Sequence, residues 1–338
     1  AELFTFTPYR SGGNPLADLY RNASHTRREY LRCLKQILAF QPDALYIRYS
    51  FADSHFIHFL QQLRRTLGEK LPVCLEIATY PYDNELRSLR RPGLFYLYLA
   101  DLVYRRQLRH HIDRIVTFTR FQEIFGLPTI NISNGVDTRT IRPASNHGQH
   151  TARDGYPFIG VSNLGFWTGY ERLIDGLADY ANSGATEKVT FHIVGDGLHR
   201  GSLQQRVEQR GITDCVLFHG AHSGESLERL FQGCQLAVGN LGVHRKGMVT
   251  NPDLKNREYC SRGLPFITST IDPGFPEDFP YLLQISADET PLEVTALVSF
   301  VNKVQREDGH REAIRWYAEQ HFDWSVMLQP VAEKIRGE

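Results

Sequence analysis

The sequence lacks the features that mark several large classes of protein. No apolar run approaches the roughly 18 residues of a membrane-spanning helix, so no spanning segment is expected. The five cysteines lie far apart, are odd in number and form no Cys-x-x-Cys pair, which argues against a disulfide framework or a zinc knuckle and favours a reducing cytoplasm. The opening residues, AELFTFTPYR, are typical of a strand entering a loop and not of a signal peptide.

Net charge is also absent, because 38 Lys and Arg balance 38 Asp and Glu. The balance hides an asymmetry: residues 1–150 carry 20 basic and 13 acidic side chains, whereas residues 151–338 carry 18 and 25. The first half is therefore the one that would attract an anionic surface or substrate. A polar stretch with proline and glycine, residues 143–157, separates the halves and predicts an interdomain linker.

What the sequence does contain is a regular alternation of short apolar runs and longer amphipathic stretches. With 338 residues, of which 41% are hydrophobic, the chain is long enough for two domains. The alternation predicts two doubly wound α/β domains with parallel sheets, and a ligand in the cleft where the carboxyl ends of both sheets face each other. The expected strands are 3–6, 44–49, 73–78, 114–119, 129–133, 158–162, 189–195, 216–220, 236–240 and 265–269.

Three segments are candidates for phosphate or sugar binding. PYRSGGNP (8–15) places Gly12 and Gly13 between a strand and a helix, although such a glycine pair is also an ordinary turn. VGDG (194–197) ends a strand and opens a helix, which could seat a nucleotide or simply form a capped turn.

The third segment is a helix expected over 254–261, whose amino terminus and Lys255 would point toward the cleft. Glu258 lies three residues further, on nearly the same face. A cation there suits a diphosphate and a carboxylate suits sugar hydroxyls, whereas the alternative is a solvated surface pair of little energetic value.

The stretch 85–114 combines seven arginines with interleaved aromatic residues and only three carboxylates. This composition suits an interfacial helix that rests on anionic lipid headgroups, or alternatively a core helix with a cationic rim. Nucleic-acid binding has no further support in the sequence, so no nucleic-acid partner is expected.

Several motifs resemble the retaining glycosyltransferases of the GT4-type, or "group 1", family. NGVDTRTIRP (134–143) resembles the signature that closes the first domain of that family, and FDWSVM (322–327) resembles its C-terminal segment. Between them, four more segments follow in the family's order and spacing: 158–177, 189–203, 216–231 and 254–269. The resemblance spans residues 115–330, while the first 110 residues match in pattern only.

The resemblance implies a GT-B fold and the transfer of a sugar from a nucleotide-diphosphate donor. The implied domains are 1–145 on the acceptor side, 155–310 for the nucleotide sugar, and a helical segment 311–338 that crosses back to the first domain. Such a hexosyltransferase (class EC 2.4) would use a UDP- or GDP-sugar and a glycan, lipid-linked or protein acceptor. No cofactor or metal is expected, because the sequence contains no Asp-x-Asp motif. Building a cell-surface glycan at the inner face of the plasma membrane is the expected setting.

Carried over by position, the resemblance assigns individual residues. Glu258 matches the second glutamate of an E-x7-E motif that holds the ribose, whereas the first falls on Thr250. The lysine of the second domain's first loop is replaced by Thr168, so we assign the displaced positive charge to Lys255, with Lys246 or Arg245 as helper. The remaining donor-side candidates are Gly13, Asn163, Gly195, Asp196, Gly197, His219, Gly220, Leu254 and Arg257.

On the acceptor side, Thr79, Tyr80, Asp83 and Glu85 follow a strand that would face the cleft. The two departures at Thr168 and Thr250 make a second function credible, namely a catalytically inactive GT-B partner or substrate-binding subunit of a glycosylation complex.

Overall fold

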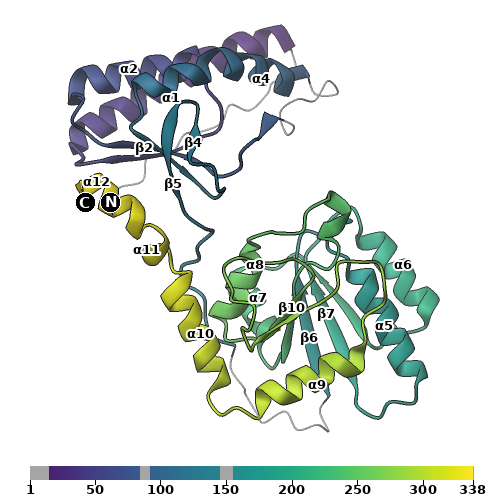
Figure 1. Cartoon of the computed structure of the whole chain (residues 1–338). Coiled ribbons are helices and arrows are strands. Elements are labelled where there is room, and N and C mark those ends of the chain that lie inside the picture. The colour runs from purple at the N-terminus through teal and green to yellow at the C-terminus, as the bar shows by residue number, and fades with distance from the viewer. Residues whose placement is uncertain (1–14, 84–91, 145–154, 338) are drawn as a thin grey trace. The chain divides into compact units, whose positions relative to one another are not determined.

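The computed structural model describes residues 15–83, 92–144 and 155–337, and the chain divides into two compact units. Unit 1 comprises Ala1–Ser133 and Leu328–Glu338, and unit 2 comprises Asn134–Met327. Each is built on one sheet covered by helices (Figure 1), so the predicted α/β class is confirmed.

The sheet of unit 1 has the order β1-β2-β3-β5-β4. All pairs are parallel except the short β4, which pairs antiparallel with β5. Its strands are β1 (Leu45–Arg48), β2 (Val73–Ile77), β3 (Arg114–Thr117), β4 (Glu123–Ile124) and β5 (Leu127–Asn131). The predicted strand 3–6 and the loop with Gly12 and Gly13 lie outside the described residues.

Successive residues of a strand point to opposite faces of the sheet, so the apolar residues of β2 are buried on both faces. Val73, Leu75 and Ile77 pack under the helical layer, whereas Cys74 packs with Val331 on the other face. The helical layer consists of α1 (Pro15–Phe40), α2 (Ser54–Leu67), α4 (Pro92–Tyr104) and the 3₁₀ helix η1 (Arg105–His110); α12 (Gln329–Arg336) covers the other face (Figure 1).

The sheet of unit 2 is parallel, with the order β11-β10-β9-β6-β7-β8. Its strands are β6 (Tyr156–Val161), β7 (Val189–Val194), β8 (Val216–Gly220), β9 (Leu236–Val238), β10 (Phe266–Thr268) and β11 (Leu282–Gln284). The chain first winds from β6 to β8 on one side and then returns to β9 on the other. β6 and β9 are therefore neighbours at a topological switch point, where parallel sheets commonly bind ligands.

Helices cover both faces of this second sheet and close its core. They are α5 (Tyr170–Asn182), α6 (Arg200–Arg210), α7 (Gly224–Phe231), η2 (Val243–Lys246), α8 (Leu254–Ser261), α9 (Val294–Gln305), α10 (His310–His321) and α11 (Trp324–Met327). The buried apolar residues of unit 2 form two clusters. One contains Phe158 and Phe191, and the other contains Ile159 and Tyr259.

The boundary between the units differs from the expected one near residue 145. Residues 134–144 pack with unit 2, because the Val136 N–H donates to Phe322 O (2.8 Å) and the Ala144 N–H donates to Arg262 O (2.9 Å). At the other end, α10 and α11 also remain in unit 2, and only Leu328–Glu338 joins unit 1. The central part of the predicted linker, 145–154, lies outside the described residues.

Candidate functional site

Lys255 lies at the switch point of the unit 2 sheet. Its Nζ donates to Ser162 Oγ (3.0 Å), just after β6, and to Asn240 Oδ1 (2.9 Å), just after β9. An ammonium group has three N–H donors, so these two neutral acceptors leave one donor for a ligand. The predicted cation thus sits at the carboxyl edge of two adjacent central strands.

Local structure around α8 explains why Lys255 points there. Asp253, the residue before the helix, accepts both Asn240 Nδ2 bonds (3.0 and 2.9 Å) and an Asn251 Nδ2 bond (2.7 Å). The helix begins at Leu254 and ends at Ser261, as predicted. Leu254 itself is the first residue of the helix, and its side chain is exposed.

Burial and the nearby carboxylates shift the pKa of Lys255 in opposite directions. Burial lowers its pKa to about 8, while the nearby carboxylates of Asp253 and Glu258 act in the opposite direction. The lysine therefore remains largely protonated at pH 7 but titrates in an accessible range. A diphosphate bound to its free donor would add a further anion and favour the charged form.

Glu258 lies one turn further on the same helix. Burial raises the pKa of its carboxyl, whereas Arg262 and Lys255 act to lower it. Within the described parts of the chain its carboxylate has no hydrogen-bond or ion-pair partner, since Arg262 pairs instead with Glu228 (2.6 Å). A partly buried carboxylate without a partner is suited to accept hydroxyl groups of a ligand.

Arg257 has a different role from the predicted donor contact. Its side chain is fully buried and forms a two-pronged ion pair with Asp272 (2.8 and 3.1 Å). It also donates to the backbone oxygens of Asn134 (2.8 Å) and Asp253 (2.9 Å). These bonds anchor α8 in the core, and they turn Arg257 away from the face that carries Lys255.

The glycines of the 195–197 loop are required by a close backbone approach. A Cβ on Gly195 would lie 1.8 Å from Ser162 O, and one on Gly197 would lie 2.7 Å from Asn163 Oδ1. Asp196 Oδ1 accepts the N–H of Gly197 (2.8 Å). The structure therefore brings the predicted residues Asn163, Gly195, Asp196 and Gly197 together beside Ser162, which also contacts Lys255.

His219 and Gly220 are the last two residues of β8, which lies next to β7 in the sheet. The Gly195 N–H donates to Gly220 O (2.7 Å), which joins this strand end to the glycine loop. The His219 ring stacks on His192 with an interplanar angle of 5°, and their Nε2 and Nδ1 atoms lie 3.0 Å apart. Burial lowers the pKa of both imidazoles.

Thr168 stands in the loop between β6 and α5 where the family lysine was expected. It is buried, and its hydroxyl donates to Gly165 O (2.8 Å), so it closes the loop and presents no charge. A cation reaches this loop from η2 instead, because Lys246 Nζ lies 3.8 Å from the centroid of the Trp167 ring. Among the described residues, Lys246 has no carboxylate partner.

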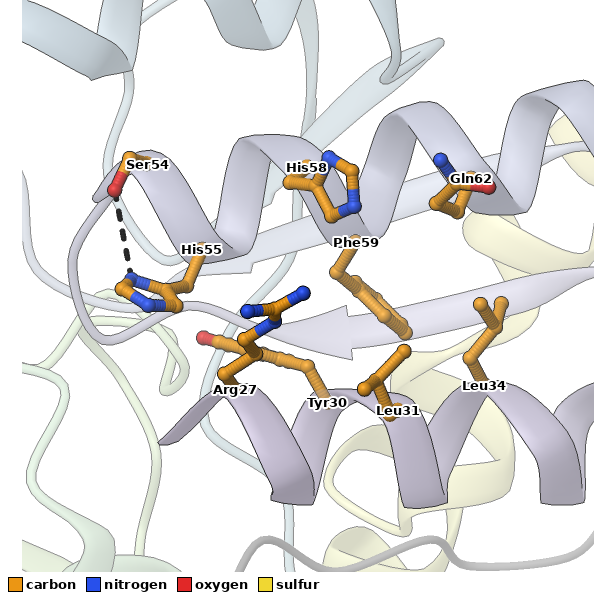
Figure 2. Close-up of a pocket in the computed structure, with 9 residues that line it drawn as sticks. All are labelled: Arg27, Tyr30, Leu31, Leu34, Ser54, His55, His58, Phe59 and Gln62. Carbon is orange, nitrogen blue, oxygen red and sulfur yellow. Dashed lines mark hydrogen bonds between the residues drawn. The ribbon is translucent and has the colours of Figure 1, made fainter. Parts of the chain in front are cut away.

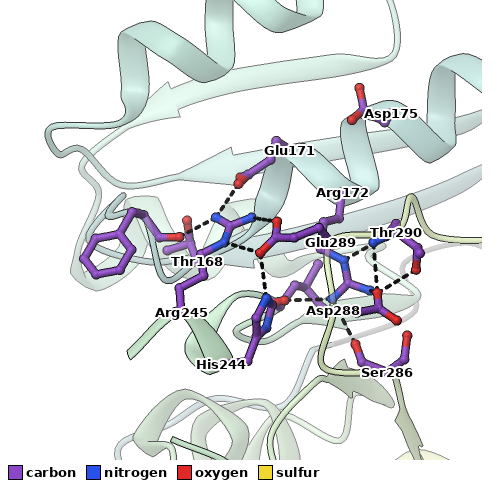
Figure 3. Close-up of polar contacts among 12 residues, drawn as sticks. Thr168, Glu171, Arg172, Asp175, His244, Arg245, Ser286, Asp288, Glu289 and Thr290 are labelled. Carbon is purple, nitrogen blue, oxygen red and sulfur yellow. Dashed lines mark hydrogen bonds and ion pairs between the residues drawn. The ribbon is translucent and has the colours of Figure 1, made fainter. Parts of the chain in front are cut away.

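The positive charge of Arg245 is paired with carboxylates, so this side chain is not available to bind an anionic ligand (Figure 3). It pairs with Glu171 and with both oxygens of Glu289, and Nη1 donates to Phe166 O (2.5 Å). The bond from Arg245 lowers the pKa of Glu289 to about 2. This network fixes η2 to α5 and to the 288–290 loop, and so holds the neighbouring Lys246 in place.

Thr250, at the position of the expected first glutamate, is exposed and forms an isolated bridge with Ile271. Sequence reasoning did not identify Ser162, Asn240 or Asp253 as members of the site. Each could have been found as a polar residue that directly follows a predicted strand or precedes the predicted helix.

The acceptor-side residues belong to unit 1 and follow β2. Thr79 is exposed, Tyr80 packs edge-on against Phe121 at 5.0 Å between ring centroids, and Asp83 pairs with Arg105 (2.9 Å). Glu85 and Gly13 lie outside the described residues.

A buried cluster that the sequence did not reveal holds this segment. Asp101 is fully buried and accepts the hydroxyls of Tyr49 and Tyr82, the latter at 2.7 Å, and the Ala52 N–H at 2.7 Å. Arg105 approaches the same carboxylate at 3.5 Å. Asp101 thereby ties α4 to the ends of β1 and β2.

Unit 2 is similar to a known protein family. Residues 158–290 match the family model described as Glycosyl transferases group 1. This stretch of unit 2 is similar to that family. The predicted resemblance to this family is confirmed for these residues. No curated protein sequence matches it.

Solved structures share the fold of the whole chain. A glycosyltransferase from Rickettsia africae ESF-5 has a TM-score of 0.61 at 11% identity, covering 98% of this chain and 84% of its own. Anabaena Alr3699/HepE, solved in complex with UDP, has a TM-score of 0.60 at 14% identity, covering 92% and 82%. An α,α-trehalose-phosphate synthase (UDP-forming) from Burkholderia xenovorans has a TM-score of 0.56 at 14% identity, covering 94% and 79%. The predicted GT-B fold is therefore confirmed.

The described residues contain neither a cluster of metal ligands nor a membrane-spanning helix. No three His, Cys, Asp or Glu side chains there converge as ligands for a metal ion. In the same residues, no helix combines the length and the apolar character needed to cross a membrane.

Proposed function

We propose that this chain transfers a sugar from a UDP-sugar to a hydroxyl group of a glycan, lipid-linked or protein acceptor, with retention of the anomeric configuration. The observation that carries the proposal is Lys255 at the switch point, with one N–H donor left after Ser162 and Asn240. UDP is favoured over GDP because Anabaena Alr3699/HepE was solved with UDP and with UDP-glucose.

In this reaction the bond between the anomeric carbon and the diphosphate oxygen breaks, and the diphosphate leaves with the electron pair. The acceptor oxygen bonds to the anomeric carbon on the face that the diphosphate leaves, and its proton passes to the departing phosphate oxygen. Negative charge grows on the leaving diphosphate, and Lys255 would stabilise it electrostatically together with the backbone N–H groups at the start of α8. Lys246, which lies on η2 over Trp167 of the β6–α5 loop, would assist.

The other donor-side residues would orient the nucleotide. Glu258 would accept hydrogen bonds from the ribose hydroxyls, because its carboxylate is otherwise unpartnered within the described residues. Asn163 and the 195–197 loop would contact the diphosphate side, and His219 with Gly220 would border the base. On unit 1, Thr79, Tyr80 and Asp83 would contact the acceptor.

Nucleotide-dependent thermal stability tests the donor site. We expect UDP to raise the melting temperature more than GDP or ADP, since a ligand at 100 times its Kd stabilises the folded state by about 2.7 kcal/mol. Glu258→Gln should weaken UDP binding by about tenfold, the effect of losing a hydrogen bond to a charged group. The matched control is Glu312→Gln, an exposed glutamate on α10, which should bind UDP normally.

Donor hydrolysis separates the enzyme from an inactive binding subunit. We expect slow release of UDP from a UDP-sugar without acceptor. NMR of the released sugar, recorded before its anomers interconvert, should show the anomeric configuration of the donor. UDP binding without any release of UDP would support the partner subunit, and an inverted product would overturn the retaining mechanism.

A further inference from the structure

The helical layer of unit 1 has a strong excess of positive charge. Together α1, α2, α4 and η1 contain ten arginines and lysines but three carboxylates. One of these carboxylates, Asp101, is fully buried among hydrogen-bond donors. The outer surface of this layer therefore presents mainly cations to its surroundings.

An exposed apolar stripe runs along α4 in the same layer. Tyr96, Leu99 and Val103 are 60%, 47% and 65% exposed, and they recur at intervals of three and four residues. This spacing places them on one side of the helix. The opposite side packs inward, where Asp101 contacts Tyr49 and Tyr82.

Exposed arginines of η1 lie next to the end of the α4 stripe. In the 3₁₀ helix η1, residues three apart lie above one another, so Arg106 and Arg109 extend the line that ends at Val103. Both arginines are exposed, and neither has a carboxylate partner among the described residues. An apolar face bordered by arginines without carboxylate partners is the arrangement that binds anionic lipid surfaces.

A groove between α1 and α2 has the same character (Figure 2). It encloses about 310 Å³, with Leu31 and Phe59 in its walls and Arg27, His55 and His58 around them. None of the described residues that line it is acidic. The groove thus adds a second apolar surface bordered by a cation, Arg27, to the same helical layer.

We propose that unit 1 docks on an anionic lipid surface through the α4 stripe, with Arg106 and Arg109 contacting the headgroups. The proposal is independent of the donor chemistry, because vesicle binding is measured without sugar transfer. Docking would bring an acceptor embedded in that surface within reach of this unit.

Flotation of the full chain with vesicles tests the proposal. We expect binding to phosphatidylcholine vesicles that contain phosphatidylglycerol, little binding to pure phosphatidylcholine, and release in about 0.5 M salt, where charges are screened within a few ångströms. Arg106→Glu with Arg109→Glu should lower the partition coefficient at least tenfold, because each cation near the surface contributes about 1 kcal/mol. Leu99→Ser with Val103→Ser should also lower it about tenfold.

The matched controls lie on unit 2. Arg229→Glu with Arg306→Glu makes the same charge change at exposed arginines of α7 and the end of α9, and Leu217→Ser removes an exposed leucine from β8. These variants should float like the unchanged chain, and circular dichroism should show all of them folded. No binding to anionic vesicles, equal binding to both vesicle types, or equal loss in the charge control would overturn the proposal. A change of oligomeric state in the Leu99 and Val103 variant without vesicle binding would assign the stripe to a protein interface instead.

Discussion

Each unit carries a polar cluster where its parallel strands end, and the two clusters differ in what they leave unsatisfied. In unit 2, Lys255 keeps one N–H donor and Glu258 keeps a carboxylate without a partner in the described structure. In unit 1, Asp101 accepts from Tyr49, Tyr82 and Ala52, and this cluster satisfies itself. Unfilled hydrogen-bonding capacity marks a place for a ligand, whereas a closed network stabilises the segment it ties together.

The largest effect should follow from removing the cation of unit 2. Lys255→Ala should lower kcat/KM for the UDP-sugar by about 10²-fold or more, because an electrostatic contact to the developing charge is lost. Steady-state kinetics measure this, with Lys303→Ala on the exposed side of α9 as the control. Near-normal kcat/KM would remove Lys255 from the site.

Breaking the closed cluster of unit 1 should affect stability rather than donor binding. Asp101→Asn replaces an acceptor by a donor among buried donors, and we expect the free energy of unfolding to fall by about 2 kcal/mol. Urea unfolding measures this change, while the Kd for UDP should stay constant. Asp43→Asn, at an exposed aspartate, should change neither quantity. If Asp101→Asn weakened UDP binding as strongly as Lys255→Ala, the contrast between the clusters would be lost.

The pH dependence of kcat/KM tests whether Lys255 must be protonated for activity. Since its pKa is lowered to about 8, kcat/KM should fall as pH rises through about 8, by roughly tenfold at pH 9. Unfolding cannot cause this loss through Lys255, because a lysine with a lowered folded-state pKa makes the folded state more stable as pH rises between about 8 and 10.5. Lys255→Arg should move the alkaline limb upward, and an unchanged limb in that variant would assign it to another group.

The smallest effect is expected at the exposed network around Arg245. Glu289→Gln leaves Glu171 as a partner for Arg245, so the free energy of unfolding should fall by about 0.5 kcal/mol and kcat/KM by about twofold. Thermal unfolding and kinetics can be compared with Glu312→Gln. A loss as large as that of Lys255→Ala would place Glu289 in the donor site itself.

Much of the candidate site in unit 2 could be predicted because its parts lie close together in the sequence. The helix Leu254–Ser261 follows from a local pattern, and the three-residue spacing of Lys255 and Glu258 puts them on one face. The same periodicity could have corrected the prediction for Arg257, because a residue two positions after Lys255 lies about 200° around the helix. The glycines 195 and 197 were also recognisable, since they directly follow a buried strand.

Other parts could not be predicted from local patterns. Glu289 lies 44 residues from Arg245, and nothing near Arg245 in the sequence indicates that its charge is already paired. Tyr49, Tyr82 and Asp101 come from three separate segments, and only their joint burial forms the cluster. The stripe on α4 was visible as a basic and aromatic stretch, but which of its apolar residues are exposed depends on the packing of α4.

The sequence by itself determined the α/β class, the order of most strands and helices, and the positions of the charged residues in α8. These properties follow from periodicity and turn chemistry, which act over a few residues. Only the tertiary structure decided which of those charges are free: it paired Arg257 with Asp272 and Arg245 with Glu289, and it left Lys255 with a spare donor. The reason is physical, because the partner that neutralises a charge is set by distance in space, and folding brings together residues that the chain keeps far apart.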